Sequence, residues 1–82
     1  MDKIFIKQYI YNLTTESGIA LAKRNNIILT NDEAKTLISF LRRNINDIDI
    51  KNKTILLNKL KKEVPLSTYK KSELLLNKIL KI

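Results

Sequence analysis

The scarcity of glycine and proline constrains the fold of this chain more than any other feature. Gly18 and Pro65 are the only residues of their types among 82. Both types interrupt helices and populate tight turns, so a chain that nearly lacks them favours long helices with short connections. Because 82 residues support only a modest core, we expect one all-α domain over residues 1–82.

Apolar residues at helical spacing predict two helices at the start of the chain. Residues 4–13 show this spacing, although their β-branched and aromatic content leaves a strand possible. Thr14 or Thr15 is the candidate N-cap of a second helix that ends near Asn25. The inner face of this second helix is expected to hold Gly18, Ile19, Leu21 and Ala22.

The strongest local motif marks the start of a third helix. A short extended connector at residues 27–29 precedes Thr30 and Glu33, which match a capping box. In this motif the Thr30 hydroxyl accepts from the Glu33 amide, and the Glu33 carboxylate accepts from the Thr30 amide. We expect the helix to end at Arg43, with Asn44 as its C-cap. Its buried stripe is predicted to be Ala34, Leu37, Ile38 and Leu41, with Phe40 at the edge.

A fourth helix is expected after a connector at residues 45–48. Asp47 or Asp49 is its candidate N-cap, and Pro65 ends it because a residue that precedes proline disfavours helical backbone. Its inner face is predicted to hold Leu56, Leu57, Leu60 and Val64.

Ser67 is the candidate N-cap of a fifth helix, from Thr68 to the C-terminus. Its inner arc is predicted to hold Tyr69, Leu75, Leu76, Ile79, Leu80 and Ile82. The whole pattern predicts a single compact bundle of about five short helices with an extended connector near residues 27–29.

Positive charge is concentrated in the second half of the chain. Residues 1–50 carry seven basic and six acidic side chains, whereas residues 51–82 carry nine basic and two acidic ones. A codon bias toward lysine would affect the whole chain, so it does not explain the difference in charge between the two halves. The late lysines project from the outer faces of the fourth and fifth helices, where they either solvate the surface or contact an anionic partner. The candidate contact residues are Lys51, Lys59, Lys62, Lys70, Lys71 and Lys78.

Two aliphatic residues also fall on these lysine-rich faces. Ile55 lies among the lysines of the fourth helix, and Leu74 lies on the polar side of the fifth. Single exposed aliphatic side chains are common on protein surfaces. Two of them on a basic surface also fit a protein contact that uses both charge and apolar area, so Ile55 and Leu74 are further candidate contact residues.

The residue types present argue against an enzyme. The chain has no histidine and no cysteine, which removes the commonest general base, the thiolate nucleophile and the soft metal ligands. The neighbouring carboxylates of Asp32 and Glu33, and of Asp47 and Asp49, are explained by helix starts. We therefore expect no catalytic residue, no cofactor and no metal site.

A DNA-reading helix-turn-helix motif formed by the second and third helices is disfavoured. The connector over residues 26–30 exceeds the usual three to four residues. Asp32 and Glu33 also place negative charge where a recognition helix would approach DNA. A nucleic-acid contact would therefore use the basic second half, mainly on phosphates.

Hydropathy gives no sign of membrane insertion. No apolar run approaches the roughly 18–20 residues that span a bilayer. Lys3 and Lys7 interrupt the N-terminal segment too early for a signal-peptide core. We expect a cytoplasmic protein.

A series of short motifs runs through nearly the whole chain. They are Phe5-Ile6-Lys7-Gln8, Leu13-Thr14-Thr15-Glu16, Ala22-Lys23, Ile28-Leu29-Thr30, Glu33-Ala34, Leu41-Arg42 and Ser67-Thr68. Their order resembles a family of small bacterial proteins classified as a domain of unknown function. Members usually have a glycine directly after the Leu-Arg pair, where this chain has Arg43. The resemblance implies a small helical cytoplasmic protein, and it supplies no activity, ligand or catalytic residue.

These observations predict a non-enzymatic binding or adaptor protein that contacts another protein or a second copy of itself. The alternative is sequence-tolerant binding of RNA or DNA phosphates by residues 51–82. If Lys51, Lys59, Lys62 and Lys70 each neutralise one phosphate of a duplex, the logarithm of the affinity should fall with that of the salt concentration with a slope of about −3.6.

Overall fold

The computed structural model describes the backbone of residues 3–48 and 51–80, and the side-chain surroundings of residues 7–48 and 51–78. Its elements are α1 (Lys3–Asn12), α2 (Thr15–Arg24), α3 (Asn31–Arg43), the short 3-10 helix η1 (Ile45–Asp47), α4 (Lys53–Glu63) and α5 (Leu66–Leu80). The described residues contain no strand, so the first segment is helical and the predicted all-α bundle is confirmed.

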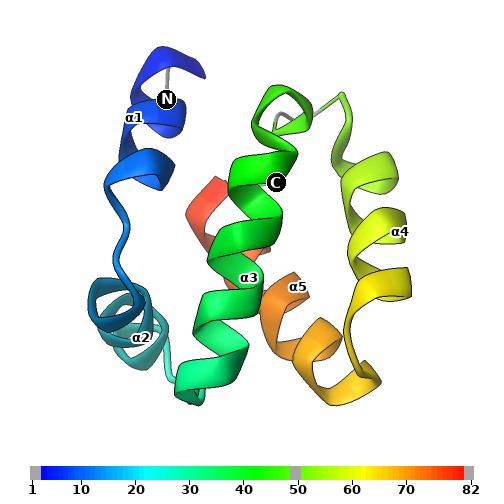
Figure 1. Cartoon of the computed structure of the whole chain (residues 1–82). Helices are drawn as coiled ribbons and strands as arrows, with labels where there is room; N and C mark the ends of the chain where they lie inside the picture. The colour runs from blue at the N-terminus through cyan, green and yellow to red at the C-terminus, as the bar shows by residue number, and fades with distance from the viewer. Residues whose placement is uncertain (1–2, 49–50, 81–82) are drawn as a thin grey trace.

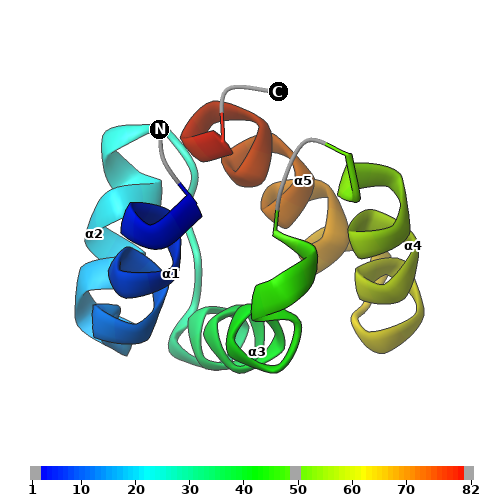
Figure 2. The same cartoon turned by 90° about the horizontal axis from the view of Figure 1, so that it is seen from above.

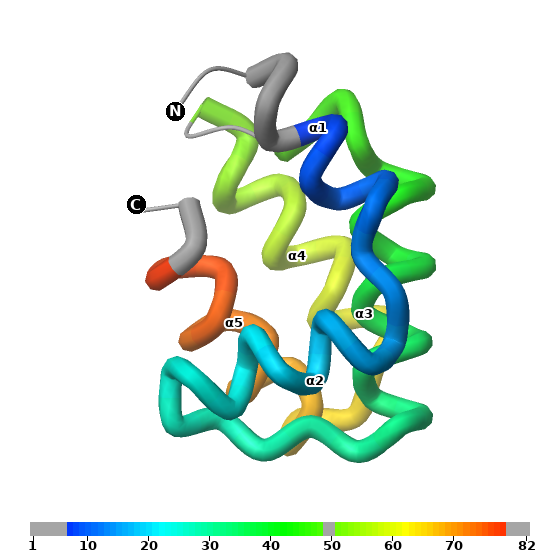
Figure 3. Tube along the Cα trace, turned by 90° about the vertical axis from the view of Figure 1, so that its left-hand side faces the viewer, coloured from blue at the N-terminus to red at the C-terminus, as the bar shows by residue number. Residues whose placement is uncertain are grey.

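Helix α3 crosses the middle of the molecule, and the other helices are arranged around it (Figure 1). Viewed from above, α3 and α5 lie on opposite sides, with α1 and α2 on one flank and α4 on the other (Figure 2). The connector after α2 crosses one end of the molecule to reach α3 (Figure 3). The extents of 27 × 25 × 20 Å show that these helices close into a compact bundle.

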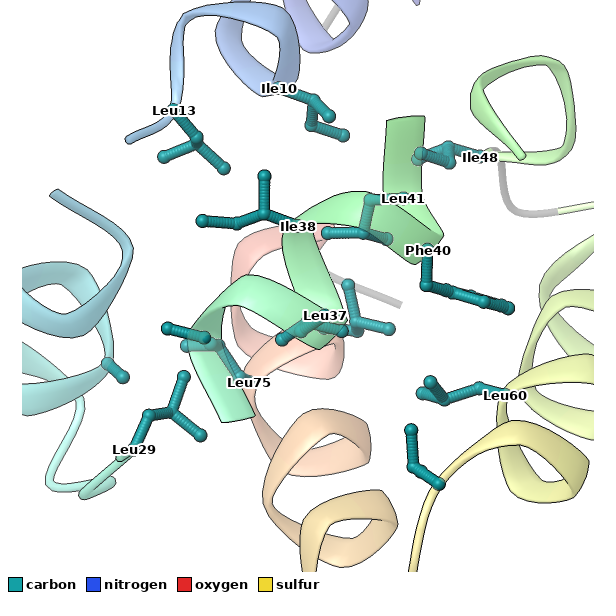
Figure 4. Packing of buried hydrophobic residues seen from close by; sticks show 14 of the residues in the cluster. Ile10, Leu13, Leu29, Leu37, Ile38, Phe40, Leu41, Ile48, Leu60 and Leu75 are labelled. Atoms are coloured by element: carbon teal, nitrogen blue, oxygen red, sulfur yellow. The ribbon is translucent and has the colours of Figure 1, made fainter. Parts of the chain in front are cut away.

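The core collects the predicted apolar faces around α3 (Figure 4). Ile38 of α3 points toward Leu13, whereas Phe40 points toward Leu60 of α4. Phe40, which the pattern placed at the edge of the stripe, is completely buried. Other helices cover α3 on both flanks, so its buried arc is wider than that of a helix packed on one side only.

The inner faces predicted for the last two helices are confirmed where the structure describes them. Leu56, Leu60 and Val64 are buried from α4, and Leu57 packs against them. In α5 the described part of the predicted arc is Leu75 and Leu76, both buried, and the half-buried Tyr69. The side chains of Ile79, Leu80 and Ile82 lie outside the described residues.

The caps predicted for the second and third helices are confirmed. Thr14 caps α2 and forms a capping box with Ser17. Thr30 and Glu33 form the predicted capping box of α3, with donor–acceptor distances of 2.9 and 3.1 Å. Asn44 is the C-cap of α3. Local sequence thus determines where these helices begin and end.

The predicted start of the fourth helix was wrong. Helix α4 begins at Lys53 with Asn52 in the N-cap position, and that cap makes no side-chain hydrogen bond to the helix. Asp47 lies instead in η1, where its carboxylate is 2.9 Å from Lys59 Nζ. The other candidate cap, Asp49, lies outside the described residues. Asp47 therefore pairs with a residue nearly two turns inside α4 and does not cap the helix.

The predicted start of the fifth helix was also wrong. Helix α5 begins at Leu66, directly after Pro65, so Ser67 lies within the first turn and not at the N-cap. The Pro65 carbonyl accepts the first intrahelical bond, from the Tyr69 amide. Proline is compatible with this place because a helix start needs no N–H donor there. The earlier start adds Leu66 to the helix.

Candidate protein-interaction surface

The Glu33 carboxylate at the start of α3 bonds two side chains of α5. Besides closing the capping box, this carboxylate accepts from the Thr68 hydroxyl at 2.9 Å and from Lys71 Nζ at 3.0 Å. Only 15% of the Glu33 side chain is exposed. One residue therefore caps α3 and joins it to α5.

The Thr30 amide bond to the charged carboxylate is the main reason that the pKa of Glu33 is lowered to about 2. The bonds from Lys71 and Thr68 act in the same direction, and they outweigh the partial burial, which acts in the opposite one. Glu33 is thus a charged structural group at neutral pH.

The same network covers the N-terminus of α3. A recognition helix would need this end free to approach DNA, whereas here Glu33 is bonded to Thr68 and Lys71 of α5. This geometry adds a structural reason to set aside a helix-turn-helix motif formed by α2 and α3.

Three of the six candidate lysines contact acceptors within the chain. Lys59 pairs with Asp47, Lys71 pairs with Glu33, and Lys78 Nζ donates to the Asn25 carbonyl at 3.1 Å. These bonds hold α4 to η1 and α5 to the start of α3 and the end of α2. The expectation that all the late lysines are free to meet a partner therefore does not hold for these three.

The remaining candidates Lys51, Lys62 and Lys70 are exposed and have no ion-pair partner among the described residues. Lys51 lies just before α4, Lys62 lies outside the buried face of α4, and Lys70 belongs to α5. A neighbouring lysine that was not a candidate, Lys61, lies 5.9 Å from the centroid of the Tyr69 ring. It bridges α4 and α5 through a cation–π contact.

The structure does not bring Ile55 and Leu74 together. Ile55 is one turn before Lys59, which bonds η1, so it shares the side of α4 that faces the end of α3. Leu74 lies between Lys71 and Lys78, which bond the start of α3 and the end of α2. Both residues are more than half exposed, at 52% and 55%, but the lysines beside them contact different elements of the fold.

Leu74 instead belongs to a row of exposed residues along α5. Leu66, Lys70, Leu74 and Lys78 are all exposed and recur at intervals of four. Residues four apart on a helix are neighbours on one side of it, so these four form one surface, here called the α5 outer face. It lies opposite the buried Ser72 and Leu76. Helix α5 itself lies across the bundle from α3 (Figure 2).

Sequence analysis missed two exposed aliphatic residues, Leu66 on this face and Ile28 in the connector. Leu66 was placed before the predicted helix, so its four-residue spacing from Lys70 did not indicate a shared helix face. Ile28, at 66% exposed, points out of the connector while Ile27 and Leu29 point in. The two-residue alternation of an extended segment would have identified Ile28, because the connector was already predicted to be extended.

A small internal cavity and the Tyr69 hydroxyl offer little for chemistry. A cavity of about 30 Å³ between α2, α3 and α5 has an entirely apolar lining that includes Gly18, Leu37 and Leu75. Tyr69, whose pKa is raised by partial burial and by its bond to Glu73, is a packing residue between α4 and α5.

The described part of the chain contains no cluster of acidic side chains that could hold a metal, and none of its helices is long and apolar enough to cross a bilayer.

Comparison with known families confirms the resemblance to a domain of unknown function. A family model described as "Protein of unknown function (DUF2624)" matches residues 1–80. The chain belongs to this family. No curated protein and no solved structure matches it significantly.

The structure gives a physical role to one motif of this DUF2624 chain. In the Leu41-Arg42 pair, Leu41 is buried, and Arg42 donates to the carbonyls of Leu13 at 2.6 Å and Tyr11 at 3.2 Å. These carbonyls, at or just beyond the end of α1, lack helical partners, so the guanidinium acts as a C-cap from another helix. Arg43 remains helical and forms a two-bond ion pair with Glu63, with both bonds at 3.1 Å.

Proposed function

We propose that this protein is a non-enzymatic binding module that acts through contact with another protein. The observation that supports the proposal best is the exposure of four aliphatic side chains, Ile28, Ile55, Leu66 and Leu74, each more than half accessible. Complete burial of one such side chain contributes roughly 1.5–3 kcal/mol, so a partner that covers several of them gains appreciable affinity.

The placement of the lysines favours a protein over a nucleic acid as the partner. Of the four lysines assigned to phosphate contacts, Lys59 is bonded to Asp47. Lys51 precedes α4, Lys62 belongs to α4 and Lys70 belongs to α5, so the remaining charge is divided among separate elements. Three phosphate contacts would give a salt slope of about −2.7 on duplex DNA, and a measured slope near zero would agree with a protein partner.

The absence of histidine and cysteine from the sequence supports a non-enzymatic role. The carboxylates of Glu33, Asp47 and Glu63 are all engaged in structural ion pairs. These engagements leave few charged groups for acid–base chemistry.

A pull-down from nuclease-treated lysate of the source organism tests the proposal. The bait is compared with a variant in which the four exposed aliphatic residues are replaced by serine, with light scattering to detect self-association. We expect a protein that the unaltered bait retains and the variant loses. Identical recovery by both baits, or retention of nucleic acid alone before nuclease treatment, would contradict the proposal.

A further inference from the structure

We propose that the α5 outer face, extended by Ile28, is the docking surface for an acidic amphipathic helix of a partner protein. This inference rests on the proposed protein-binding function and names the surface and the chemistry of its ligand.

Ile28 adjoins the α5 outer face because the connector runs beside α5. At one end the Lys78 ammonium bonds the Asn25 carbonyl, and at the other the Lys71 ammonium bonds Glu33. Ile28 lies between Asn25 and Glu33, and Leu74 lies between Lys71 and Lys78. Both aliphatic side chains therefore belong to the same edge, although they are 46 positions apart in the sequence.

The spacing of the apolar residues fits a helix. Leu66 and Leu74 are eight residues apart, which corresponds to about 12 Å along the axis of α5. A ligand helix with aliphatic residues two turns apart matches this separation. The stem of Lys70 lies between the two leucines and adds apolar contact, while its ammonium stays in water.

The charge around this face selects an acidic ligand. Lys70 is exposed on the face itself, and Lys23 and Arg24 are exposed at the adjoining end of α2. Lys78 adds positive charge to this face, although its ammonium also donates to the Asn25 carbonyl. Asp32 is the exposed carboxylate at the connector end. Glutamate or aspartate residues that flank the aliphatic stripe of a ligand helix would meet these cations, which promotes association and excludes basic segments.

The same charge disfavours a second copy of this chain as the occupant. The chain carries a net charge of +8, and a symmetric dimer through this face would bring both sets of cations together. A partner of opposite charge avoids this repulsion.

Binding of a labelled 18-residue helical peptide tests the inference. The peptide has leucine at every fourth position and glutamate on both sides of that stripe, and its affinity is measured by fluorescence anisotropy. A matched peptide with lysine in place of every glutamate tests the charge requirement. Anionic phospholipid vesicles and a 20-base-pair DNA duplex test whether a membrane surface or a nucleic acid binds this face instead.

The chain provides a matched pair of variants. Leu74→Ser and Ile55→Ser each remove an aliphatic side chain with about half its surface exposed, so neither should change folding, which circular dichroism verifies. We expect Leu74→Ser to weaken binding of the glutamate peptide by about fivefold or more and Ile55→Ser by less than about twofold. Lys70→Glu should also weaken it by about fivefold or more, and Lys62→Glu should have little effect.

Three results would overturn the inference: equal effects of Leu74→Ser and Ile55→Ser, no binding of the glutamate peptide, or Leu74-dependent binding of vesicles or DNA in its place. Failure of the surface and failure of the proposed function remain distinguishable. If the captured protein depends on Ile55 and not on Leu74, the α5 outer face is wrong and the binding function stands. If the variant with four serines retains everything, the binding function itself fails.

Discussion

The Glu33 carboxylate at the start of α3 lies 3.0 Å from the ammonium of Lys71 in the middle of α5. The two residues are 38 positions apart, and Glu33 also closes the capping box of its own helix. On the same helix, Leu75 and Leu76 are buried in the core while Leu74 remains exposed. The ion pair therefore belongs to the helix that carries both core residues and the proposed docking surface.

Replacing Glu33 with glutamine should destabilise the protein by about 1.5–3 kcal/mol. The change weakens a cap and leaves the partly buried Lys71 ammonium without its counter-charge. Urea denaturation measures the loss. The matched control is Glu63→Gln, whose ion pair with Arg43 is largely exposed and should contribute less than about 0.5 kcal/mol. Equal effects of the two changes would refute the central role of Glu33.

The stability of the protein should fall in acid because of the same carboxylate. The pKa of Glu33 is about 2 in the folded protein and near its ordinary value of 4.5 in the unfolded chain. The unfolded state therefore binds the proton first, so the stabilisation is complete above about pH 5 and is lost as the pH falls toward 2. After allowance for solvent screening, we expect this group to contribute about 1–2 kcal/mol.

Urea denaturation at pH 7 and pH 3 checks this prediction. Other carboxylates and the rising positive charge affect the unaltered protein and the Glu33→Gln variant alike. The unaltered protein should lose more stability than the variant between the two pH values. An equal loss would show that Glu33 titrates normally.

Replacing Gly18 with alanine should stabilise the protein by about 0.5–1 kcal/mol. Gly18 lies inside α2, where glycine costs helical stability relative to alanine. A Cβ atom there would lie 3.0 Å from Ile38 Cδ1. Both residues line the apolar cavity, so this terminal methyl group has space into which it can move.

Thermal unfolding of Gly18→Ala should show a midpoint raised by about 2–8 °C. The reverse change at an exposed position of the same helix, Ala20→Gly, should lower the midpoint by a similar amount. A lower midpoint for Gly18→Ala would mean that Ile38 cannot move and that the close approach of α2 and α3 requires glycine.

Replacing Arg42 with glutamine should release the end of α1. The guanidinium bonds the Tyr11 and Leu13 carbonyls, and a side chain that is shorter and uncharged cannot replace both bonds. We expect the substitution to lower the free energy of unfolding by about 1–2 kcal/mol. Hydrogen exchange should become faster at the α1 amides, and it should change less at the α4 amides. The neighbouring Arg43→Gln should leave α1 exchange unchanged, and a uniform increase in both variants would contradict this role.

Sequence alone predicted those parts of the fold that local chemistry determines. The Thr30–Glu33 box, the Thr14 cap and the inner faces of α4 and α5 each depend on neighbouring residues, so their patterns are readable in the chain. The second role of Glu33 was not predictable, because Thr68 and Lys71 reach it only after the helices have packed.

Tertiary packing also explains the errors at the candidate surface. The sequence identifies lysines on an outer face but not the acceptor that each of them meets, so Lys59 and Lys78 could not be separated from Lys70. Leu74 was identified correctly as exposed, and we propose that it acts with Ile28 from the connector and not with Ile55 from α4. The complete burial of Phe40 was not predicted, because a single stripe does not describe a helix that is covered on two flanks.

The most direct test of the proposed surface is a ¹H–¹⁵N correlation spectrum of the protein during titration with the leucine–glutamate peptide. We expect the largest amide shift changes along α5 at Leu66, Lys70, Leu74 and Lys78, with a second group around Ile28. The amides around Ile55 should change little. Changes centred on α4, or small changes spread over the whole molecule, would contradict docking on the α5 outer face.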